Sequence, residues 1–418
     1  MLSIHRSLRQ EIVEHLSRKE MTLLTGPRQA GKTTLLKEIA AGLEGQDLLF
    51  LNLDIPKDRG LLEDQEKFVA YLHAFSGGKP STIFIDEIQR LENAGLYLKG
   101  IYDRDLPYKF VLTGSGSLEL KEKVTESLVG RKRNFNLLTT SIEEFAAYKT
   151  NYQFGTRLGE ILATNQVLRE EILTEYLMFG GYPAVVTEKR ESDKLRTLEE
   201  IYQGYIERDI VAMLQLEKSQ AFITLMRLMA SRSGSIVNYS DLAKLTTLRH
   251  ETIKKYLWYA EKTFIIRPIS PFFTNKEKEL VKAPSYYFLD IGLRNYLRGI
   301  FDDPSDTGMR FQTFVYRLLE KRFRHAIASI HFWRSKAKAE VDFVVNRGPD
   351  LLPVEVKSTA LKTPSVTRSY RSFLEQYKPK EGWVVNRSLS ADVMIGETIV
   401  RFIPWWELME GAWSGEKG

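Results

Sequence analysis

A glycine-rich loop that joins an apolar run to a helical pattern constrains this 418-residue chain more than any other feature. The run at 21–25 leads directly into residues that match G-x-x-x-x-G-K-[ST] at every defined position. These residues, with the next helical one, are Gly26, Pro27, Arg28, Gln29, Ala30, Gly31, Lys32, Thr33 and Thr34. Glycines let the backbone N–H groups of such a loop turn toward phosphate, and the following helix adds its positive N-terminus. The loop therefore predicts a nucleotide-binding α/β domain built on a parallel sheet.

A second apolar run, at 82–85, ends in Asp86 and Glu87. Downstream of a phosphate loop, we expect Asp86 to lie near Mg²⁺ and Glu87 to orient or deprotonate a water molecule. Lys32 should reach the β- and γ-phosphates, and the Thr33 hydroxyl should bind Mg²⁺. A glutamate directly after the aspartate favours ATP hydrolysis over transfer to a substrate. The predicted cofactors are therefore ATP and Mg²⁺.

Two further polar positions are expected to sense the γ-phosphate. The strand-like run at 109–113 ends in Thr113, and Ser115 follows it; either hydroxyl suits this role, with a plain turn as the alternative. Arg131 is the predicted arginine finger, which would spread charge from the transferring phosphoryl group. Arg133 is its nearby rival, and basic surface charge is the alternative for both.

The chain is predicted to divide into three parts, at 1–150, 151–300 and 301–418. Strand-like and helical patterns alternate in the first part, which is typical of a parallel α/β sheet. Helical patterns dominate from about residue 141 onward. A turn-rich linker at 302–306 precedes a helix at 308–324 and strands at 331–334, 341–346 and 352–356, which predict a second α/β module.

The segment 239–289 has the pattern of a winged helix. We expect a short helix capped by Ser240, a turn at 246–247, a second helix at 249–261 and two wing strands at 264–268 and 285–289. Arg249, Lys254 and Lys255 would lie on the exposed face of the second helix, where helix-turn-helix units contact DNA. A purely structural or protein-binding role is the alternative.

A carboxylate and lysine pattern follows in the last part of the chain. Glu355 and Lys357 alternate on one face of a predicted strand, and Asp342 belongs to the strand before it. The two carboxylates would bind Mg²⁺, and Lys357 would activate water or stabilise charge. Basic residues surround this pattern and suit a phosphate backbone: Arg310, Arg317, Lys321, Arg322, Arg324, Arg334, Lys336 and Lys338.

Taken together, the segments 24–34, 85–89, 112–115 and 128–131 resemble a prokaryotic (archaeal and bacterial) AAA+ ATPase family with a C-terminal restriction-endonuclease-like (PD-(D/E)xK) domain of unknown function. The segments 180–183 and 205–210 resemble its middle signatures. The resemblance implies the fold and ATP binding. It also implies a glutamate in the pattern G-x-x-F-E-x-x-V, where this chain has Gln312. The amide removes a negative charge from the metal site, so we expect no nuclease activity; a substitute carboxylate from Glu320, on the same helix, is the alternative.

Composition limits the remaining possibilities. Hydrophobic residues at 43% and charged residues at 27% are typical of globular domains. The chain has no cysteine, and its start has no apolar core of a signal peptide, so we expect a soluble cytoplasmic protein without a membrane partner. A net charge of +6 is compatible with DNA binding but does not require it.

The predicted function is an ATPase that repositions its C-terminal modules on nucleic acid or protein. The alternatives are an ATP-driven nuclease and a non-enzymatic, ATP-loaded protein-binding switch. The sequence sets no oligomeric state.

Overall fold

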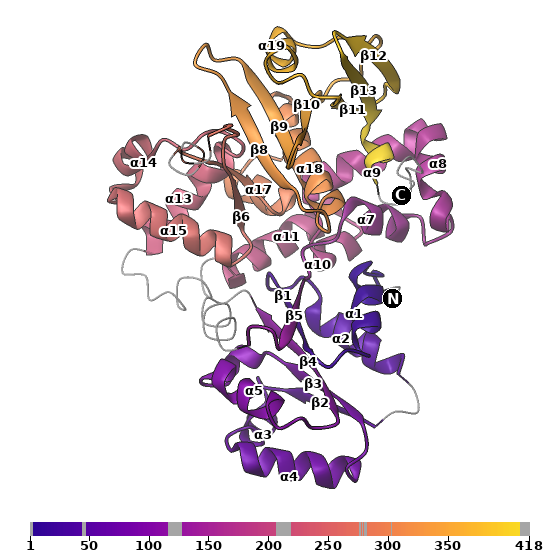
Figure 1. The fold of residues 1–418 in the computed structure, drawn as a ribbon, viewed down its shortest axis with the longest axis vertical. Helices are drawn as coiled ribbons and strands as arrows, with labels where there is room; N and C mark the ends of the chain where they lie inside the picture. The colour runs from indigo at the N-terminus through magenta and orange to yellow at the C-terminus, as the bar shows by residue number, and fades with distance from the viewer. Residues whose placement is uncertain are drawn as a thin grey trace.

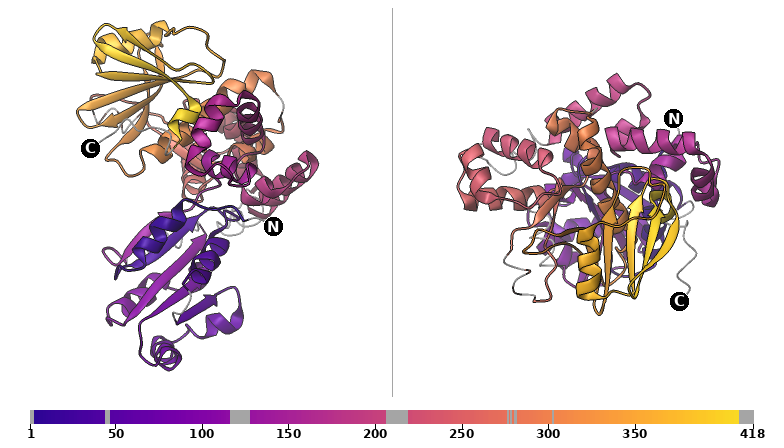
Figure 2. Two further views of the ribbon diagram at one scale, coloured as in Figure 1. Left: turned by 90° about the vertical axis from the view of Figure 1, so that its right-hand side faces the viewer. Right: turned by 90° about the horizontal axis from the view of Figure 1, so that it is seen from above.

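The two larger β-sheets lie at opposite ends of the molecule, with helices packed between them (Figure 1). The computed structural model describes residues 3–43, 47–115, 128–205, 219–275, 277, 279, 282–301 and 303–409. The first sheet belongs to the N-terminal part and the second to the C-terminal part, and the side view separates the two (Figure 2). The predicted α/β class with two sheet modules is therefore confirmed.

The N-terminal sheet is parallel and five-stranded, in the order β2-β3-β4-β1-β5. Its strands are β1 (Met21–Gly26), β2 (Leu48–Asn52), β3 (Ser81–Asp86), β4 (Tyr108–Ser115) and β5 (Lys132–Asn136). Four of them match strand-like runs of the sequence, at 21–25, 48–53, 82–85 and 109–113. β5 was missed because its sequence, KRNFN, is polar and has a single fully buried side chain. Because the strands are parallel, the segments that follow β1, β3 and β4 emerge at one edge of the sheet.

Helices cover both faces of this sheet. The side chains of α1 (Leu8–His15) and α2 (Lys32–Ala41) pack together on one face. Those of α4 (Gln65–Ser76) and α5 (Ala94–Tyr102) pack on the other face. The short helix α3 (Pro56–Gly60) follows β2. The helices on its two faces hold the sheet in place, and the phosphate loop lies at the edge where the strands end.

The middle of the chain is helical, as predicted. Its first helices are α7 (Ile142–Lys149), α8 (Leu158–Thr164), α9 (Gln166–Phe179), α10 (Pro183–Thr187) and α11 (Glu191–Ile201). Although the predicted boundary at 150 assigns α7 to the first part, its buried residues pack with α9 and with the C-terminal module. The sequence has a helical pattern at 194–215, which extends beyond α11, and residues 206–218 lie outside the described part of the chain.

The segment predicted to be a winged helix forms two helices and a two-stranded sheet, and a further helix, α13, precedes it. These elements are α13 (Ser219–Ser231), α14 (Tyr239–Thr246), α15 (His250–Lys262), and the antiparallel pair β6 (Ile266–Ile269) and β7 (Ser285–Phe288). Ile236 adds a bridge to Ser285. The predicted cap was wrong: the Asn238 side chain, not that of Ser240, accepts the backbone N–H of Asp241, at 3.1 Å.

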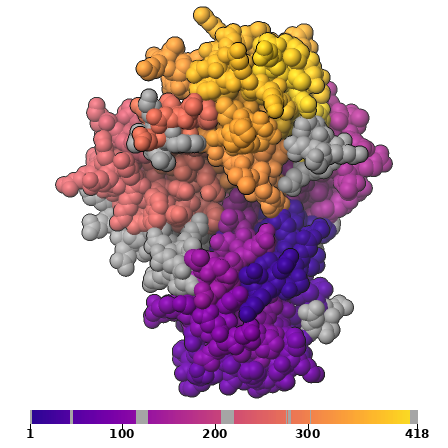
Figure 3. Space-filling view, viewed as in Figure 1, coloured from indigo at the N-terminus to yellow at the C-terminus, as the bar shows by residue number. Residues whose placement is uncertain are grey.

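The C-terminal sheet has six strands in the order β12-β13-β11-β10-β9-β8. Its strands are β8 (Ser329–Arg334), β9 (Glu340–Arg347), β10 (Asp350–Val356), β11 (Glu381–Asn386), β12 (Ala391–Ile395) and β13 (Thr398–Pro404). The first three form an antiparallel meander, and β11 joins β10 in parallel after α19 (Arg368–Tyr377). The module lies at the top of the space-filling view, with the N-terminal sheet domain at the bottom (Figure 3). The last three strands and α19 were not predicted.

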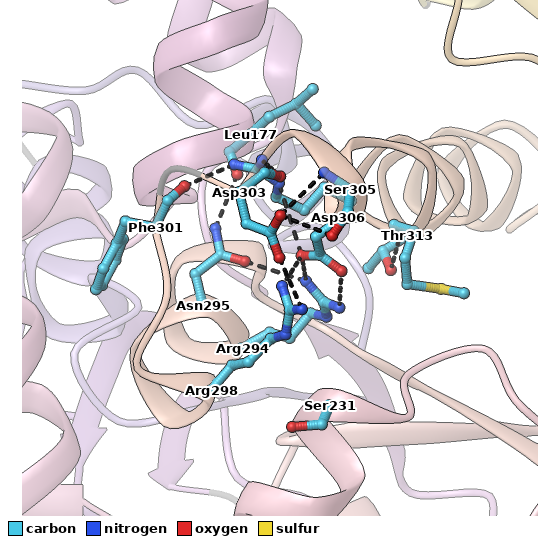
Figure 4. A network of polar contacts seen from close by, with 12 residues as sticks. Leu177, Ser231, Arg294, Asn295, Arg298, Phe301, Asp303, Ser305, Asp306 and Thr313 are labelled. Atoms are coloured by element: carbon cyan, nitrogen blue, oxygen red, sulfur yellow. Dashed lines mark hydrogen bonds and ion pairs between the residues drawn. The ribbon is translucent and has the colours of Figure 1, made fainter.

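The predicted linker before this module is part of a buried ionic network (Figure 4). Arg294, on α17 (Ile291–Arg298), donates to both carboxylate oxygens of Asp306, at 2.6 and 2.8 Å. Arg298 pairs with the same carboxylate at 2.9 Å and with Asp303 at 3.0 Å. Arg310, on α18 (Thr307–Arg322), donates to the Asp303 carbonyl at 2.7 Å. Three arginines therefore fix the start of α18 against α17, so residues 303–306 are held in place by ion pairs and hydrogen bonds.

In the described part of the chain, none of the helices combines the length and the apolarity needed to span a bilayer.

Candidate functional site

The phosphate loop joins β1 to α2 as the motif predicts. Gly31 has φ 90°, a left-handed conformation that favours glycine, and it is the N-cap of α2. At Gly26 a Cβ atom would lie 2.0 Å from the carbonyl oxygen of Leu137, so no side chain fits there. The Lys32 Nζ donates to the carbonyl oxygens of Gly26 at 3.2 Å and Pro27 at 2.8 Å. Burial lowers the pKa of Lys32 to about 8.

The predicted carboxylates lie beside this loop at the carboxyl end of β3. One Asp86 oxygen accepts the Thr33 hydroxyl at 2.7 Å, and the other accepts the Thr113 hydroxyl. The backbone N–H of Glu87 donates to Thr113 Oγ1 at 3.1 Å. Burial raises the pKa of Glu87, whose carboxylate accepts from Gln89. Three strands and the phosphate loop thus bring two hydroxyls and two carboxylates together.

The loop opens into a cavity of about 680 Å³ whose far wall comes from the helical middle. That volume lies within the range of small-molecule sites. On the loop side, Arg28, Gln29, Gly31, Lys32, Thr33, Thr34, Asp54, Glu87 and Arg90 line it. Pro183, Ala184, Gly204 and Tyr205 complete the wall, and we had assigned no nucleotide contact to them. The two glycines and the proline of 180–183 indicate a turn, but no local signal in the sequence shows that this turn faces the loop.

Backbone packing explains both glycines of that turn. A Cβ on Gly181 would lie 2.2 Å from the carbonyl oxygen of Thr140, and one on Gly180 would lie 2.4 Å from Asp290. The backbone N–H of Gly181 donates to Asp290 Oδ2 at 2.9 Å. Asp290 is the N-cap of α17, so the turn that leads into the cavity wall at Pro183 is bonded directly to the helix of the ionic network.

Arg6 is a second residue that sequence reasoning missed. Its buried guanidinium donates to the carbonyl of Ala30 in the phosphate loop at 2.7 Å and to that of Leu138 at 2.6 Å. It also donates to Glu144 Oε2 at 3.0 Å. Glu144 belongs to the capping box of α7 and accepts the Ser7 backbone N–H at 2.8 Å. No motif surrounds Arg6 in the sequence, so only the fold identifies it.

The structure does not bring Arg131 to the phosphates of its own chain. Arg131 precedes β5 at the amino end of the sheet, where its carbonyl accepts the N–H of Met21, the first residue of β1. The phosphate loop lies at the other end of β1. The Arg131 side chain pairs with Asp103 at 2.7 Å. A finger role toward a second chain stays a prediction. Ser115 pairs in register with Gly26, and its side chain lies outside the described residues.

The carboxylate and lysine pattern of the C-terminal module converges as predicted. Asp342 on β9 accepts the Val356 N–H at 2.7 Å and the Gln312 amide at 3.0 Å. Lys357 donates to Glu355 at 2.9 Å. Burial, and then the Glu355 charge, raise the pKa of Asp342 to about 7. Gln312 therefore occupies the position beside Asp342 that the pattern assigns to a carboxylate.

Other predictions for this module were wrong. Glu320 does not replace the missing acid, because it pairs with Arg317 and lies 3.4 Å from Arg267. Arg310 is buried in the ionic network rather than on a basic face. Among the residues that the structure describes, no group of three or more histidine, aspartate or glutamate side chains is arranged to hold a metal ion.

The basic residues of α15 lie where the pattern predicts. Arg249, Lys254 and Lys255 are exposed, whereas Ile253 and Leu257 on the opposite face are buried. Lys254 lies over the ring of Tyr239, 5.4 Å from its centre. Their contact with DNA stays a prediction.

Three family models match successive parts of the chain. Residues 18–146 match the AAA domain, residues 170–304 a domain of unknown function (DUF8612), and residues 307–408 another domain of unknown function (DUF4143). An uncharacterized protein of Mycobacterium tuberculosis is 27% identical over 381 residues, which cover 90% of this chain and 78% of the relative. One of Methanocaldococcus jannaschii is 24% identical over 347 residues, covering 81% and 75%.

Solved structures give more distant similarities. The Walker-type ATPase of Pyrococcus abyssi covers 71% of this chain and 96% of its own, with a TM-score of 0.41 and 15% identity. The ORC2 protein of Aeropyrum pernix in its ADP form covers 72% and 94%, with a TM-score of 0.35 and 13% identity. The match at 307–408 leaves the restriction-endonuclease-like assignment a prediction. From its sheet, its phosphate loop and its match to the AAA domain, the N-terminal part of the chain has the fold of an AAA-type P-loop ATPase.

Proposed function

We propose that this protein binds and hydrolyses ATP at the cavity between the phosphate loop and α10. The observation that carries the proposal is the convergence of Lys32, Thr33, Asp86, Glu87 and Thr113 at one sheet edge. The phosphate loop would hold the β- and γ-phosphates, and Lys32 would leave its two carbonyl acceptors to bind them. Glu87 would orient the attacking water, and its raised pKa suits a general base.

The oxygen donors beside the loop fit a magnesium ion. The Thr33 hydroxyl and the Asp86 carboxylate are hard oxygen ligands 2.7 Å apart, of the kind that Mg²⁺ binds together with substrate phosphates. When bound, the ion would neutralise charge on the phosphates. Thr113 would hold Asp86 in position from the opposite side, because its hydroxyl donates to the second carboxylate oxygen.

ATP binding and turnover can be tested separately. Lys32→Ala should abolish measurable ATP binding, because its charge acts on the phosphates. Glu87→Gln should retain ATP binding but lose hydrolysis by about a hundredfold or more, as expected for loss of a general base. Calorimetry measures the first effect and phosphate release the second. Glu92→Gln is a matched control on the same segment, because Glu92 is exposed and does not line the cavity. Native turnover in Glu87→Gln would contradict the water-orienting role.

We further propose that nucleotide occupancy repositions the C-terminal half. Pro183 and Ala184 line the cavity, and Gly181 just before them is bonded to Asp290 at the start of α17. That helix is fixed to α18 by the ionic network. A ligand that contacts α10 would therefore shift the position of α18, the helix that carries Gln312. Repositioning requires that ATP binds more tightly to one arrangement of the C-terminal half than to the other.

The C-terminal module is proposed to bind nucleic acid without cutting it. The antiparallel meander, α19 and parallel β11, with Asp342, Glu355 and Lys357 at adjacent strands, support a restriction-endonuclease-like fold. The helix, bridge, two helices and paired strands of 219–288 support a winged helix. Both Asp342 oxygens already accept hydrogen bonds, one from the Gln312 amide and one from the Val356 N–H. Because Gln312 also replaces the carboxylate of the family pattern, these contacts argue against a working metal site.

Cleavage is the sharpest test of that proposal. Native protein should not cut plasmid or single-stranded DNA with Mg²⁺ or Mn²⁺, with or without ATP. Gln312→Glu restores the charge and should strengthen Mn²⁺ binding, since hard cations depend on carboxylate charge. Asp342→Ala is the control in both assays. Robust cutting that disappears in Asp342→Ala would favour the ATP-driven nuclease instead. DNA binding that is absent at low salt would favour the protein-binding switch.

A further inference from the structure

A second cavity lies where the ATPase domain meets the other two parts of the chain. It has a volume of about 340 Å³ and lies between β5, α7, α9, β6 and α18. In Figure 1 this is the region where β5, α7 and α18 converge. The volume is within the range of small-molecule sites, and one side of the wall is apolar, with Leu137, Phe314 and Leu318. It is separate from the nucleotide cavity, because no residue lines both.

The polar side of this cavity has a surplus of positive charge. Six arginine and lysine side chains line it, against four glutamates. The cations are Arg6, Arg133, Arg267, Arg317, Lys321 and Arg324, and the acids are Glu11, Glu143, Glu144 and Glu320. Each of the four acids already pairs with one of these cations. The lining therefore carries two more positive charges than negative ones.

Two of the arginines that line the cavity have guanidinium groups that can still bind a ligand. Arg133 is exposed, and no described acidic side chain forms an ion pair with it. Arg267 shares Glu320 with Arg317, and its Nε atom is buried without a hydrogen-bond partner among the described residues. A buried N–H group that lacks a partner is unfavourable, and an oxyanion in the cavity would supply one. Guanidinium groups bind phosphate through paired N–H donors, and more selectively than lysine does.

We propose that this cavity is a binding site for a small molecule that carries phosphate, distinct from the ATP site. Its phosphate would lie against Arg133 and Arg267, and its less polar part against Phe314 and Leu318. The site joins the edge of the ATPase sheet to α18. Arg6, which lines it, also donates to Ala30 of the phosphate loop. The proposal does not depend on ATP hydrolysis, because the site lies outside the nucleotide cavity.

Calorimetric titration of sodium phosphate into the full chain tests it. Every variant carries Lys32→Ala, which removes the phosphate loop as a competing site. We expect binding in this background, and about a tenfold loss from either Arg133→Gln or Arg267→Gln, the usual scale for a charge-assisted hydrogen bond. Arg196→Gln is the matched control, because that side chain is 80% exposed on α11 and does not line the cavity. It should bind phosphate as tightly as the background.

Three outcomes would overturn the proposal. The first is no binding of phosphate to the Lys32→Ala chain. The second is unchanged affinity in both arginine variants, which would move the bound phosphate to another surface. The third is tighter binding of sodium citrate, titrated in parallel, than of phosphate; the cavity would then select carboxylates. Two arginine variants are used so that a folding defect in one leaves the other decisive.

Discussion

A single buried histidine makes the stability of the ATPase domain depend on pH. His15 ends α1 and is buried, with Nδ1 2.8 Å from the hydroxyl of Thr22 on β1. Burial, and then the positive charges of Lys109 and Arg133, lower its pKa to about 4. The ring is therefore neutral in the folded chain at neutral pH, whereas in the unfolded chain it would take a proton near its ordinary pKa of 6.5.

The expected result is a loss of stability as the pH falls from about 6.5 to about 4. In this window the unfolded chain binds one more proton at His15 than the folded chain, so acid favours unfolding. His15→Gln keeps a hydrogen-bonding group beside Thr22 but cannot titrate. The urea midpoint should therefore fall less between pH 7 and pH 5 in this variant than in the native protein. An equal fall in both would show that His15 is protonated in the folded state.

Residues with defined chemistry were predicted well when a local motif carried them. Lys32, Thr33, Asp86 and Glu87 lie together because each follows a strand of the same parallel sheet, and sequence order alone reveals that. Arg6 could not be found in this way. Its partners Ala30, Leu138 and Glu144 are 24, 132 and 138 residues away in the chain. Such contacts depend on how the modules dock, which no short pattern encodes.

At the scale of elements, the α14–α15 pair presents one basic face and one apolar face. The apolar residues of α15 pack into the core of the middle region, and this fixes the orientation of the basic residues toward solvent. Changing Arg249, Lys254 and Lys255 to glutamate should weaken DNA binding and reduce its salt dependence, since each phosphate contact releases about one counterion. Gel-shift titration at two salt concentrations measures both effects.

The control has the same change in net charge at a distant surface. Lys57, Arg59 and Lys99 are exposed on α3 and α5 of the ATPase domain, and their triple glutamate variant should bind DNA nearly as the native protein does. If the two triple variants weaken binding equally, net charge rather than α15 determines the affinity. If neither weakens it, the recognition-helix assignment is wrong.

Elements with strong periodicity were predicted, and those whose packing is set by tertiary contacts were not. The helices α9 and α15 lie within a few residues of the helical patterns at 168–178 and 249–261, and the strands β1 and β3 match the apolar runs at 21–25 and 82–85. β5 has exposed, polar residues because it is an edge strand beside β1. The edge strand β12 likewise has no fully buried residue. An edge position weakens the burial pattern on which sequence reasoning depends.

At the scale of the whole molecule, the Arg6–Glu144 pair joins three parts of the chain. It connects the N-terminal segment, the phosphate loop and the capped start of α7. Both side chains are less than a tenth exposed, at 7% and 9%. Removal of one partner from a buried ion pair leaves the other charge uncompensated and typically costs about 3–5 kcal/mol.

A double-mutant cycle on this pair tests whether the modules are coupled through it. Arg6→Met and Glu144→Gln should each destabilise the protein, and the double variant should lose about 1–3 kcal/mol less than the sum, because the pair interacts directly. Arg6→Met should also weaken ATP binding, since the Ala30 carbonyl then loses its donor and the phosphate loop its fixed position. Arg157→Met is the matched control, because that arginine is 73% exposed and pairs with Glu160 on the surface. Its loss should change neither the free energy of unfolding nor the affinity for ATP. Additive destabilisation with native ATP affinity would mean that Arg6 and Glu144 each serve their own module, and that the docking of the ATPase domain depends on other contacts.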